Sequence, residues 1–219
     1  TLVVLDMLRH GEEEEALKEA LRLAEENPKD PTVSNLVAGI YISRGDLKTA
    51  REIMEPAIAE HPHQLALMRT MDRIDVAEGN FEAVEARSRA AMEANPEDEQ
   101  IILRLAQFLA QRGRRDEAID LLNTKAEALP QSLGLRQALI QFNLRLEQPD
   151  RARQWADQAL AIGEGGEPRG LILAGESYLA MQDYPAAIDT FQKLLEMSGQ
   201  STNALLKLAQ AQFHGGNLD

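Results

Sequence analysis

The side chains in this sequence best suited to bind a ligand are arginines and glutamines, which recur in three short stretches at helical spacing. They are Arg69 and Arg73, then Arg104, Gln107 and Gln111, and then Gln137, Gln141 and Arg145. A guanidinium group binds a carboxylate through two parallel hydrogen bonds, and a primary amide can pair with the backbone of an extended peptide. These residues therefore predict a binding site for a polypeptide segment or an acidic chain terminus.

Two alternatives to this interpretation are open. One is that Arg69 and Arg73 pair with Asp72, Asp75 and other nearby carboxylates of the same chain, which would leave them no role in binding. The other concerns the ligand, because arginines and amides also bind hydroxyl groups and uronates. An uncharged or anionic polysaccharide is therefore a second candidate ligand for the same residues.

The sequence contains no recognisable catalytic or metal-binding arrangement. It has no cysteine, and of its four histidines only His61 and His63 are close enough in sequence to act together. That pair has no fixed third ligand, so a metal site is not expected there. We also find no glycine-rich phosphate loop and no Ser/His/Asp arrangement. The sequence predicts a protein that is not an enzyme and that needs no cofactor or metal.

The composition of the chain restricts its possible fold classes and its possible binding partners. The chain has 219 residues, of which 44% are hydrophobic but only 4% aromatic, so the core must consist mainly of Ala, Leu, Ile, Val and Met. Such a core favours closely packed helices and an all-α fold. The formal net charge of −13 disfavours binding to nucleic acid. No apolar stretch approaches the roughly 20 residues that a transmembrane helix requires.

A period of 34 residues determines the elements that carry the candidate binding residues. It separates successive members of two sets, Pro28, Pro62, Pro96 and Pro130, and Gly11, Gly45, Gly79 and Gly113. Between them, apolar residues follow helical spacing, for example over 33–43 and 47–60, with a turn at Gly45. Small residues recur where two helices must approach, at Ala16, Ala50, Ala118, Ala152 and Ala187 and again at Ala57, Ala91 and Ala159. Each unit is therefore a hairpin of two helices that must stack on its neighbours.

The period predicts one array over residues 1–219. Its parts are a partial unit 1–30, the units 31–64, 65–98, 99–132, 133–167 and 168–201, and a partial unit 202–219. The glycine-rich segment 163–170 interrupts the register, which indicates either a hinge or a tolerated loop insertion. Because the chain opens at Thr1, inside an apolar helical pattern, we expect it to be a piece of a longer protein.

Apolar residues at the two ends of the array lack a neighbouring hairpin. They are Leu2 and Val3 at one end and Leu205, Leu208 and Phe213 at the other. Their exposure predicts end-to-end self-association of the chain.

A 34-residue helical hairpin with glycine in its turn, alanine early in its second helix and proline at its exit resembles the tetratricopeptide repeat. The resemblance covers essentially the whole chain and is strongest in the unit that begins at Pro168, which carries Gly175, Tyr178, Ala187 and Phe191 at matching positions. It implies a right-handed superhelical solenoid in which the first helix of each hairpin lines the concave surface. The arginines and glutamines named above would then form a groove, in which Phe213 is the only aromatic position.

Some positions depart from the repeat pattern. Asp72, Asp75 and Asn143 occupy normally apolar places, and Glu147 and Gln182 stand where the repeat has a turn glycine. Looser packing is expected in those units. Trp155, which stands at helical spacing with Ala152, Ala156 and Ala159, is expected in the core rather than in a binding site.

At finer grain, the stretches 35–50 and 205–212 resemble the tetratricopeptide lipoproteins of bacterial PEP-CTERM/exosortase and exopolysaccharide systems. This resemblance implies an envelope protein that faces the periplasm and is lipid-anchored through a cysteine outside this chain. Repeat arrays of cytoplasmic proteins have the same 34-residue period, so the period does not exclude a cytoplasmic location. The leading hypothesis is a scaffold that binds a peptide or partner protein, in envelope protein sorting or exopolysaccharide assembly. The alternatives are a polysaccharide-binding scaffold and a structural array that assembles through its ends.

Overall fold

A computed structural model describes residues 1–162, 167–198 and 201–216. In these ranges the chain forms thirteen α-helices and no β-strand, which confirms the predicted all-α class. None of the helices within the described ranges is long and apolar enough to cross a membrane.

The chain divides into two compact units, Thr1–Pro96 and Glu97–Asp219. The first contains α1 (Leu2–Arg9), α2 (Glu13–Glu26), α3 (Pro31–Ser43), α4 (Leu47–Glu60), α5 (Leu65–Ala77) and α6 (Phe81–Ala94). The second contains α7 (Glu99–Gln111), α8 (Arg115–Ala128), α9 (Leu133–Arg145), α10 (Pro149–Leu160), α11 (Pro168–Ala180), α12 (Tyr184–Ser198) and α13 (Thr202–His214). The helices α3, α5, α7, α9, α11 and α13 begin at the residues where the period places the start of a unit.

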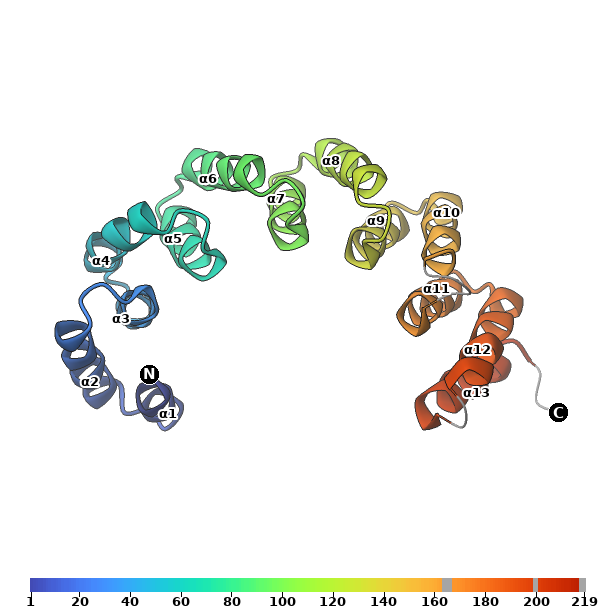
Figure 1. Cartoon of the computed structure of the whole chain (residues 1–219), viewed down its shortest axis with the longest axis horizontal. Helices are drawn as coiled ribbons and strands as arrows, with labels where there is room; N and C mark the ends of the chain where they lie inside the picture. The colour runs from blue at the N-terminus through green and yellow to red at the C-terminus, as the bar shows by residue number, and fades with distance from the viewer. Residues whose placement is uncertain (163–166, 199–200, 217–219) are drawn as a thin grey trace. The chain divides into compact units, whose positions relative to one another are not determined.

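Within each unit the helices alternate between two layers (Figure 1). In the first unit α1, α3 and α5 form one layer and α2, α4 and α6 the other. In the second unit α7, α9 and α11 lie on one side, with α8, α10 and α12 on the other. First helices of successive hairpins also contact each other directly: α7 contacts α9, and α9 contacts α11. A ligand site on the first helices is therefore built by side chains of adjacent hairpins.

Local sequence explains where the first helices begin. The side chain of Asp30 accepts a hydrogen bond of 2.8 Å from the backbone N–H of Thr32, and Pro31 occupies the first turn of α3. Asp98 and Ser132 cap α7 and α9 in the same way. These side chains satisfy backbone N–H groups that have no partner inside the helix.

The turns inside the hairpins require a left-handed backbone. Gly45 and Gly113 have φ angles of +78° and +80°, a region that glycine enters without strain. Glu147 and Gln182 adopt the same region, with φ angles of 56° and 60°. The two residues that replace turn glycines therefore preserve the hairpin geometry at a cost in backbone strain.

Small side chains let the two helices of a hairpin approach closely. The equivalent alanines early in the second helices are fully buried at Ala16, Ala50, Ala118, Ala152 and Ala187. Gly175 of α11 lies so close to the buried ring of Phe191 in α12 that a side chain at residue 175 would overlap it. Trp155 is half-buried against the core cluster of α10 to α13, in agreement with the prediction.

Most of the end residues predicted to lack cover are exposed. Leu2 and Val3 expose 83% and 60% of their surface, and Leu205 and Phe213 expose 46% and 64%. The prediction was wrong for Leu208, which is half-buried because it packs against the core cluster of α10 to α13. The interruption predicted at 163–170 cannot be followed as a whole, since residues 163–166 lie outside the described ranges.

Candidate binding pocket

A pocket of about 470 Å³ lies between α7 and α9, within the second unit. We call it the α7–α9 pocket. Its walls are Leu103, Gln107, Ala110 and Gln111 of α7, Arg115 of α8, and Ala138, Gln141, Phe142, Arg145 and Leu146 at and just beyond α9. Four of these residues, Gln107, Gln111, Gln141 and Arg145, are among those predicted from the sequence to bind a ligand.

The repeat explains why these four side chains come together. Gln107 and Gln141 are 34 residues apart and so occupy equivalent positions on adjacent first helices, as do Gln111 and Arg145. The two helices run in the same direction, because each is the first helix of a hairpin. The pocket therefore has a layer of two amides and, one helical turn further along, a layer of one amide and one guanidinium.

The remaining walls are mainly apolar. Leu103, Phe142 and Leu146 are half-buried and line the pocket. Half-buried apolar side chains leave surface in water that a ligand side chain can cover. The pocket thus combines apolar contact surface with amides and cations, which is the usual composition of a peptide or small-molecule site.

Two arginines of the pocket have no counter-ion among the residues that the structure describes. Arg115 and Arg145 are exposed, and neither makes a side-chain hydrogen bond or ion pair within the described part of the chain. By contrast, the neighbouring Arg114 pairs with Glu117 at 2.6 Å. The pocket therefore presents unneutralised positive charge on a chain whose net charge is −13.

The other predicted residues lie elsewhere. Gln137 is exposed on α9 and Arg104 is half-buried on α7, and neither lines the α7–α9 pocket. Arg69 and Arg73 are exposed on α5, in the first unit. In the part of the chain that the structure describes, neither of these two makes a side-chain hydrogen bond or ion pair. The alternative in which they pair with Asp72 and Asp75 is therefore wrong.

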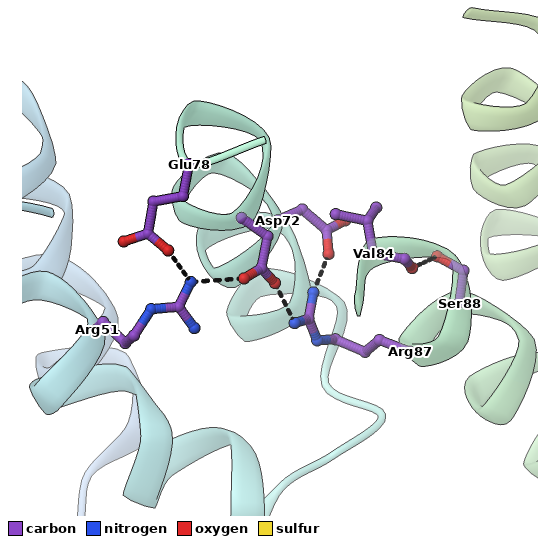
Figure 2. A network of polar contacts seen from close by, with 7 residues as sticks. Arg51, Asp72, Glu78, Val84, Arg87 and Ser88 are labelled. Carbon is purple, nitrogen blue, oxygen red and sulfur yellow. Dashed lines mark hydrogen bonds and ion pairs between the residues drawn. The ribbon is translucent and has the colours of Figure 1, made fainter. Parts of the chain in front are cut away.

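Asp72 and Asp75 pair with arginines of the neighbouring second helices instead (Figure 2). Arg51 of α4 donates to Asp75 at 2.6 Å and to Glu78 at 2.5 Å. Arg87 of α6 forms ion pairs with both Asp72 and Asp75. The bonds to Asp75 and Glu78 raise the pKa of Arg51 above its usual value.

This network explains how the chain accommodates the two aspartates, although α5 and α6 contact each other less than the helices of the other described hairpins do. Asp75 is completely buried, and a buried carboxylate is tolerated only where cations and hydrogen-bond donors surround it. The arginines of α4 and α6 meet this requirement and join three successive helices. Asn143, the polar replacement in α9, is also buried and donates to the carbonyl of Leu139 at 2.7 Å. The polar replacements have thus acquired polar partners, except that the buried side-chain oxygen of Asn143 accepts no hydrogen bond in the described part of the chain.

Sequence reasoning missed part of the pocket. Phe142 lines it, so the statement that Phe213 is the only aromatic groove position was wrong. Phe142 directly follows Gln141 and therefore lies about 100° around the helix from it. From the sequence alone, a residue at this angle from the groove positions is expected in the core. Arg115 was missed because it belongs to a second helix, of which it is the first residue.

Comparisons with known proteins agree with this architecture. The sequence profile of the tetratricopeptide repeat matches residues 75–132 and again residues 172–219. A comparison with curated protein sequences finds no match.

Solved structures with the same fold cover almost the whole chain. The PilF protein of Pseudomonas aeruginosa matches with a TM-score of 0.53 and 17% identity over 97% of this chain and 94% of that one. A tetratricopeptide repeat protein of Parabacteroides merdae matches with a TM-score of 0.51 and 18% identity, over 95% and 81% of the two chains. PilW, a type IV pilus biogenesis factor, matches with a TM-score of 0.50 and 17% identity, over 96% and 95%.

At these identities the likeness to solved structures is one of fold alone. The comparisons give no support for a specific relation to lipoproteins of PEP-CTERM systems. Two stretches of the sequence match the repeat profile, and the described helices form the corresponding hairpins. The chain therefore contains tetratricopeptide repeats and has the all-α fold of tetratricopeptide-repeat proteins.

Proposed function

We propose that this protein is a non-enzymatic scaffold that binds an extended segment of a partner protein in the α7–α9 pocket. Proteins built from tetratricopeptide repeats generally act as scaffolds for other proteins, through surfaces made by successive hairpins. The observation that carries the proposal for this chain is the composition of the pocket, in which paired amides lie beside apolar side chains.

Each part of the pocket suits one feature of an extended peptide. Gln107 and Gln141 each offer an amide donor and acceptor for the peptide backbone. Leu103 and Phe142 supply apolar surface for one or two peptide side chains. A volume of about 470 Å³ is within the range of ligand sites and accommodates a few side chains rather than a folded domain.

A selection from a random peptide library tests this proposal. The chain is compared with a Gln107→Ala/Gln141→Ala variant and a Phe142→Ala variant, and circular dichroism confirms that all remain helical. Gln137→Ala is the matched control, since Gln137 is an exposed glutamine of α9 outside the pocket. We expect selected peptides to bind the pocket variants about tenfold more weakly or worse and the control unchanged. Failure to select any peptide, or equal binding to all variants, would contradict the proposal.

A second candidate ligand is a polysaccharide, which the aromatic ring of Phe142 in the pocket favours. A sugar ring can lie against the apolar face of an aromatic side chain. A glycan array distinguishes the two ligands: a polysaccharide site predicts binding to an uncharged or uronate-containing glycan that Phe142→Ala abolishes. If the native chain binds no glycan of the array, a polysaccharide ligand is excluded.

We also propose that the protein acts in the bacterial envelope, facing the periplasm and lipid-anchored in its full-length form, in protein sorting or exopolysaccharide assembly. The support is the resemblance of residues 35–50 and 205–212 to envelope lipoproteins of this repeat class. Fractionation of cells that express the tagged full-length protein tests the location. We expect it in the membrane fraction and open to protease from the periplasmic side, and a purely cytosolic protein would contradict the proposal.

End-to-end association is a further proposal, supported by the exposure of Leu2 at one end and Phe213 at the other. Sedimentation velocity over a range of concentrations tests it. We expect the sedimentation coefficient of the chain to rise with concentration and that of a Leu2→Glu/Phe213→Glu variant to stay constant. A constant value for the native chain would exclude this association.

A further inference from the structure

We infer that the α7–α9 pocket selects extended peptide segments that carry a bulky apolar residue and, two residues away from it in either direction, an aspartate or glutamate. The inference rests on the proposed function and specifies its ligand. It follows from where the apolar and the cationic walls of the pocket lie along the two helices.

The cations gather at one end of the pocket. Arg145 is the last residue of α9, and Arg115 is the first residue of α8, just beyond the turn that follows α7. Since α7 and α9 run in the same direction, their final turns lie side by side, and both guanidinium groups belong to that end. Two guanidinium groups that lack a counter-ion among the described residues are therefore available to an acidic group of the ligand. Each can bind a carboxylate through two parallel hydrogen bonds.

Two of the apolar wall residues lie before the cations, whereas a third, Leu146, directly follows Arg145. Phe142 precedes Arg145 by three residues, and Leu103 stands further back on α7. One turn of an α-helix is about 5.4 Å long. An apolar side chain of the ligand that contacts Phe142 is therefore about one turn away from the guanidinium of Arg145.

This spacing sets the ligand sequence. In an extended peptide each residue rises about 3.3 Å and side chains alternate between faces, so that residues i and i+2 share a face about 6.6 Å apart. This distance is about 2 Å longer than the rise of about 4.5 Å between Phe142 and Arg145, a difference that the long side chain of Arg145 can span. An apolar residue against Phe142 thus places the side chain two positions away near Arg145 and Arg115, while the intervening backbone lies beside Gln107 and Gln141.

Electrostatics favour the same ligand. The chain has 36 acidic and 23 basic residues, and some of its exposed arginines pair with nearby carboxylates, as Arg22 does with Glu19, whereas others, such as Arg69, do not within the described ranges. Arg115 and Arg145 remain unpaired at one site in spite of this excess of acid. An acidic side chain of the ligand supplies the missing countercharge, whereas a basic peptide meets both arginines and is rejected.

An array of short synthetic peptides tests the inference; all are blocked at both ends except one copy of the parent, which keeps a free terminal carboxylate. The parent peptide is whichever of two sequences, Leu-Ala-Glu or Glu-Ala-Leu between glycine and serine residues, binds the native chain more tightly. Its relatives replace Glu by Gln, replace Leu by Ala, or move Glu next to Leu and so onto the opposite face. The proteins are the native chain, Arg145→Gln and Arg115→Gln, and the control Arg151→Gln, which removes the same charge from an exposed position of α10 outside the pocket.

We expect the native chain to bind the parent peptide about tenfold or more better than each relative. Arg145→Gln and Arg115→Gln lose this preference for Glu over Gln, and Arg151→Gln keeps it. Equal binding of the Glu and Gln peptides, with binding still dependent on Leu, would overturn the inference while the proposed function stands. Binding that appears only when the peptide has a free terminal carboxylate would also overturn it. If the native chain binds no peptide of the array or of a random library, the proposed function itself fails.

Discussion

The guanidinium of Arg51 in α4 donates a hydrogen bond of 2.6 Å to the carboxylate of Asp75, which is completely buried in α5. Arg87 of α6 pairs with the same carboxylate from the other side. A buried acid at a position that the repeat normally fills with an apolar side chain is thereby neutralised by two helices at once. The first unit depends at this point on an ion-pair network (Figure 2).

The first prediction concerns this network. Asp75→Ala removes the buried carboxylate, while Arg51 keeps Glu78 and Arg87 keeps Asp72, and should lower the free energy of unfolding by about 1–3 kcal/mol. Glu78→Ala is the matched control, because Glu78 also accepts from Arg51 but is exposed, and should cost less than about 1 kcal/mol. Urea denaturation followed by circular dichroism measures both. Similar losses for the two variants would show that burial of Asp75 does not determine its contribution.

The second prediction compares two helical glycines. A Cβ atom at Gly175 would lie 2.5 Å from the ring of Phe191, so Gly175→Ala should destabilise the second unit by about 1–3 kcal/mol. A Cβ atom at Gly39 of α3 meets nothing within 4 Å, and Gly39→Ala should stabilise the first unit by about 0.5–1 kcal/mol. Thermal unfolding of the two variants should move in opposite directions. A gain in stability from Gly175→Ala would refute the close packing of α11 on α12.

The third prediction concerns the turns that lack glycine. Glu147 and Gln182 have positive φ angles, and Glu147→Gly or Gln182→Gly should relieve backbone strain and stabilise the protein by about 0.5–1 kcal/mol. Gly113→Ala is the converse change in the equivalent turn of the preceding hairpin and should destabilise by a similar amount. Chemical denaturation tests all three variants. Destabilisation by both glycine substitutions would mean that their side chains contribute more than the strain costs.

The fourth prediction concerns pH. Hydrogen bonds from the backbone N–H and the hydroxyl of Thr49, at the start of α4, lower the pKa of Asp46 below its ordinary value of 3.8. A lowered folded-state pKa gives a stabilising contribution that is present above the unfolded-state pKa and is lost as pH falls through the folded-state value. Asp46→Ala should therefore lower the stability at neutral pH, and its difference from the native chain should shrink as the pH falls through the folded-state pKa, because protonation removes the charge of the cap.

The control for this prediction is Asp46→Asn. Its amide oxygen can still accept the N–H of Thr49 but carries no charge. Its stability at neutral pH should lie between those of the native chain and Asp46→Ala. Nuclear magnetic resonance titration of the Asp46 carboxyl gives its pKa directly, and a value at or above 3.8 would contradict the cap.

Much of the fold was predictable because the repeat depends on local chemistry. Gly113 is needed for a left-handed turn and Ala118 for a close helix approach, and both requirements recur at a fixed spacing in the sequence. Glu147, which replaces a turn glycine, still adopts the left-handed backbone conformation that its position requires.

The candidate site was predictable only in part. Gln107 and Gln141 could be placed on equivalent helix positions, and they do line one pocket. The contribution of Phe142 depends on how far α7 and α9 separate, which no single helix pattern specifies. The partners of Asp72 and Asp75 were missed for a related reason. Arg51 and Arg87 lie on other helices, and their reach depends on the packing of three helices together.

The binding of a selected peptide to the α7–α9 pocket is the central claim, and methyl nuclear magnetic resonance of the labelled chain tests it most directly. On addition of the peptide we expect shifts at the methyl groups of Leu103, Ala110, Ala138 and Leu146, which line the pocket. Leu206, which exposes 68% of its surface on α13, should not respond and serves as the internal reference. Shifts at Leu206 and its neighbours, with none in the pocket, would contradict the claim and place the binding site on α13.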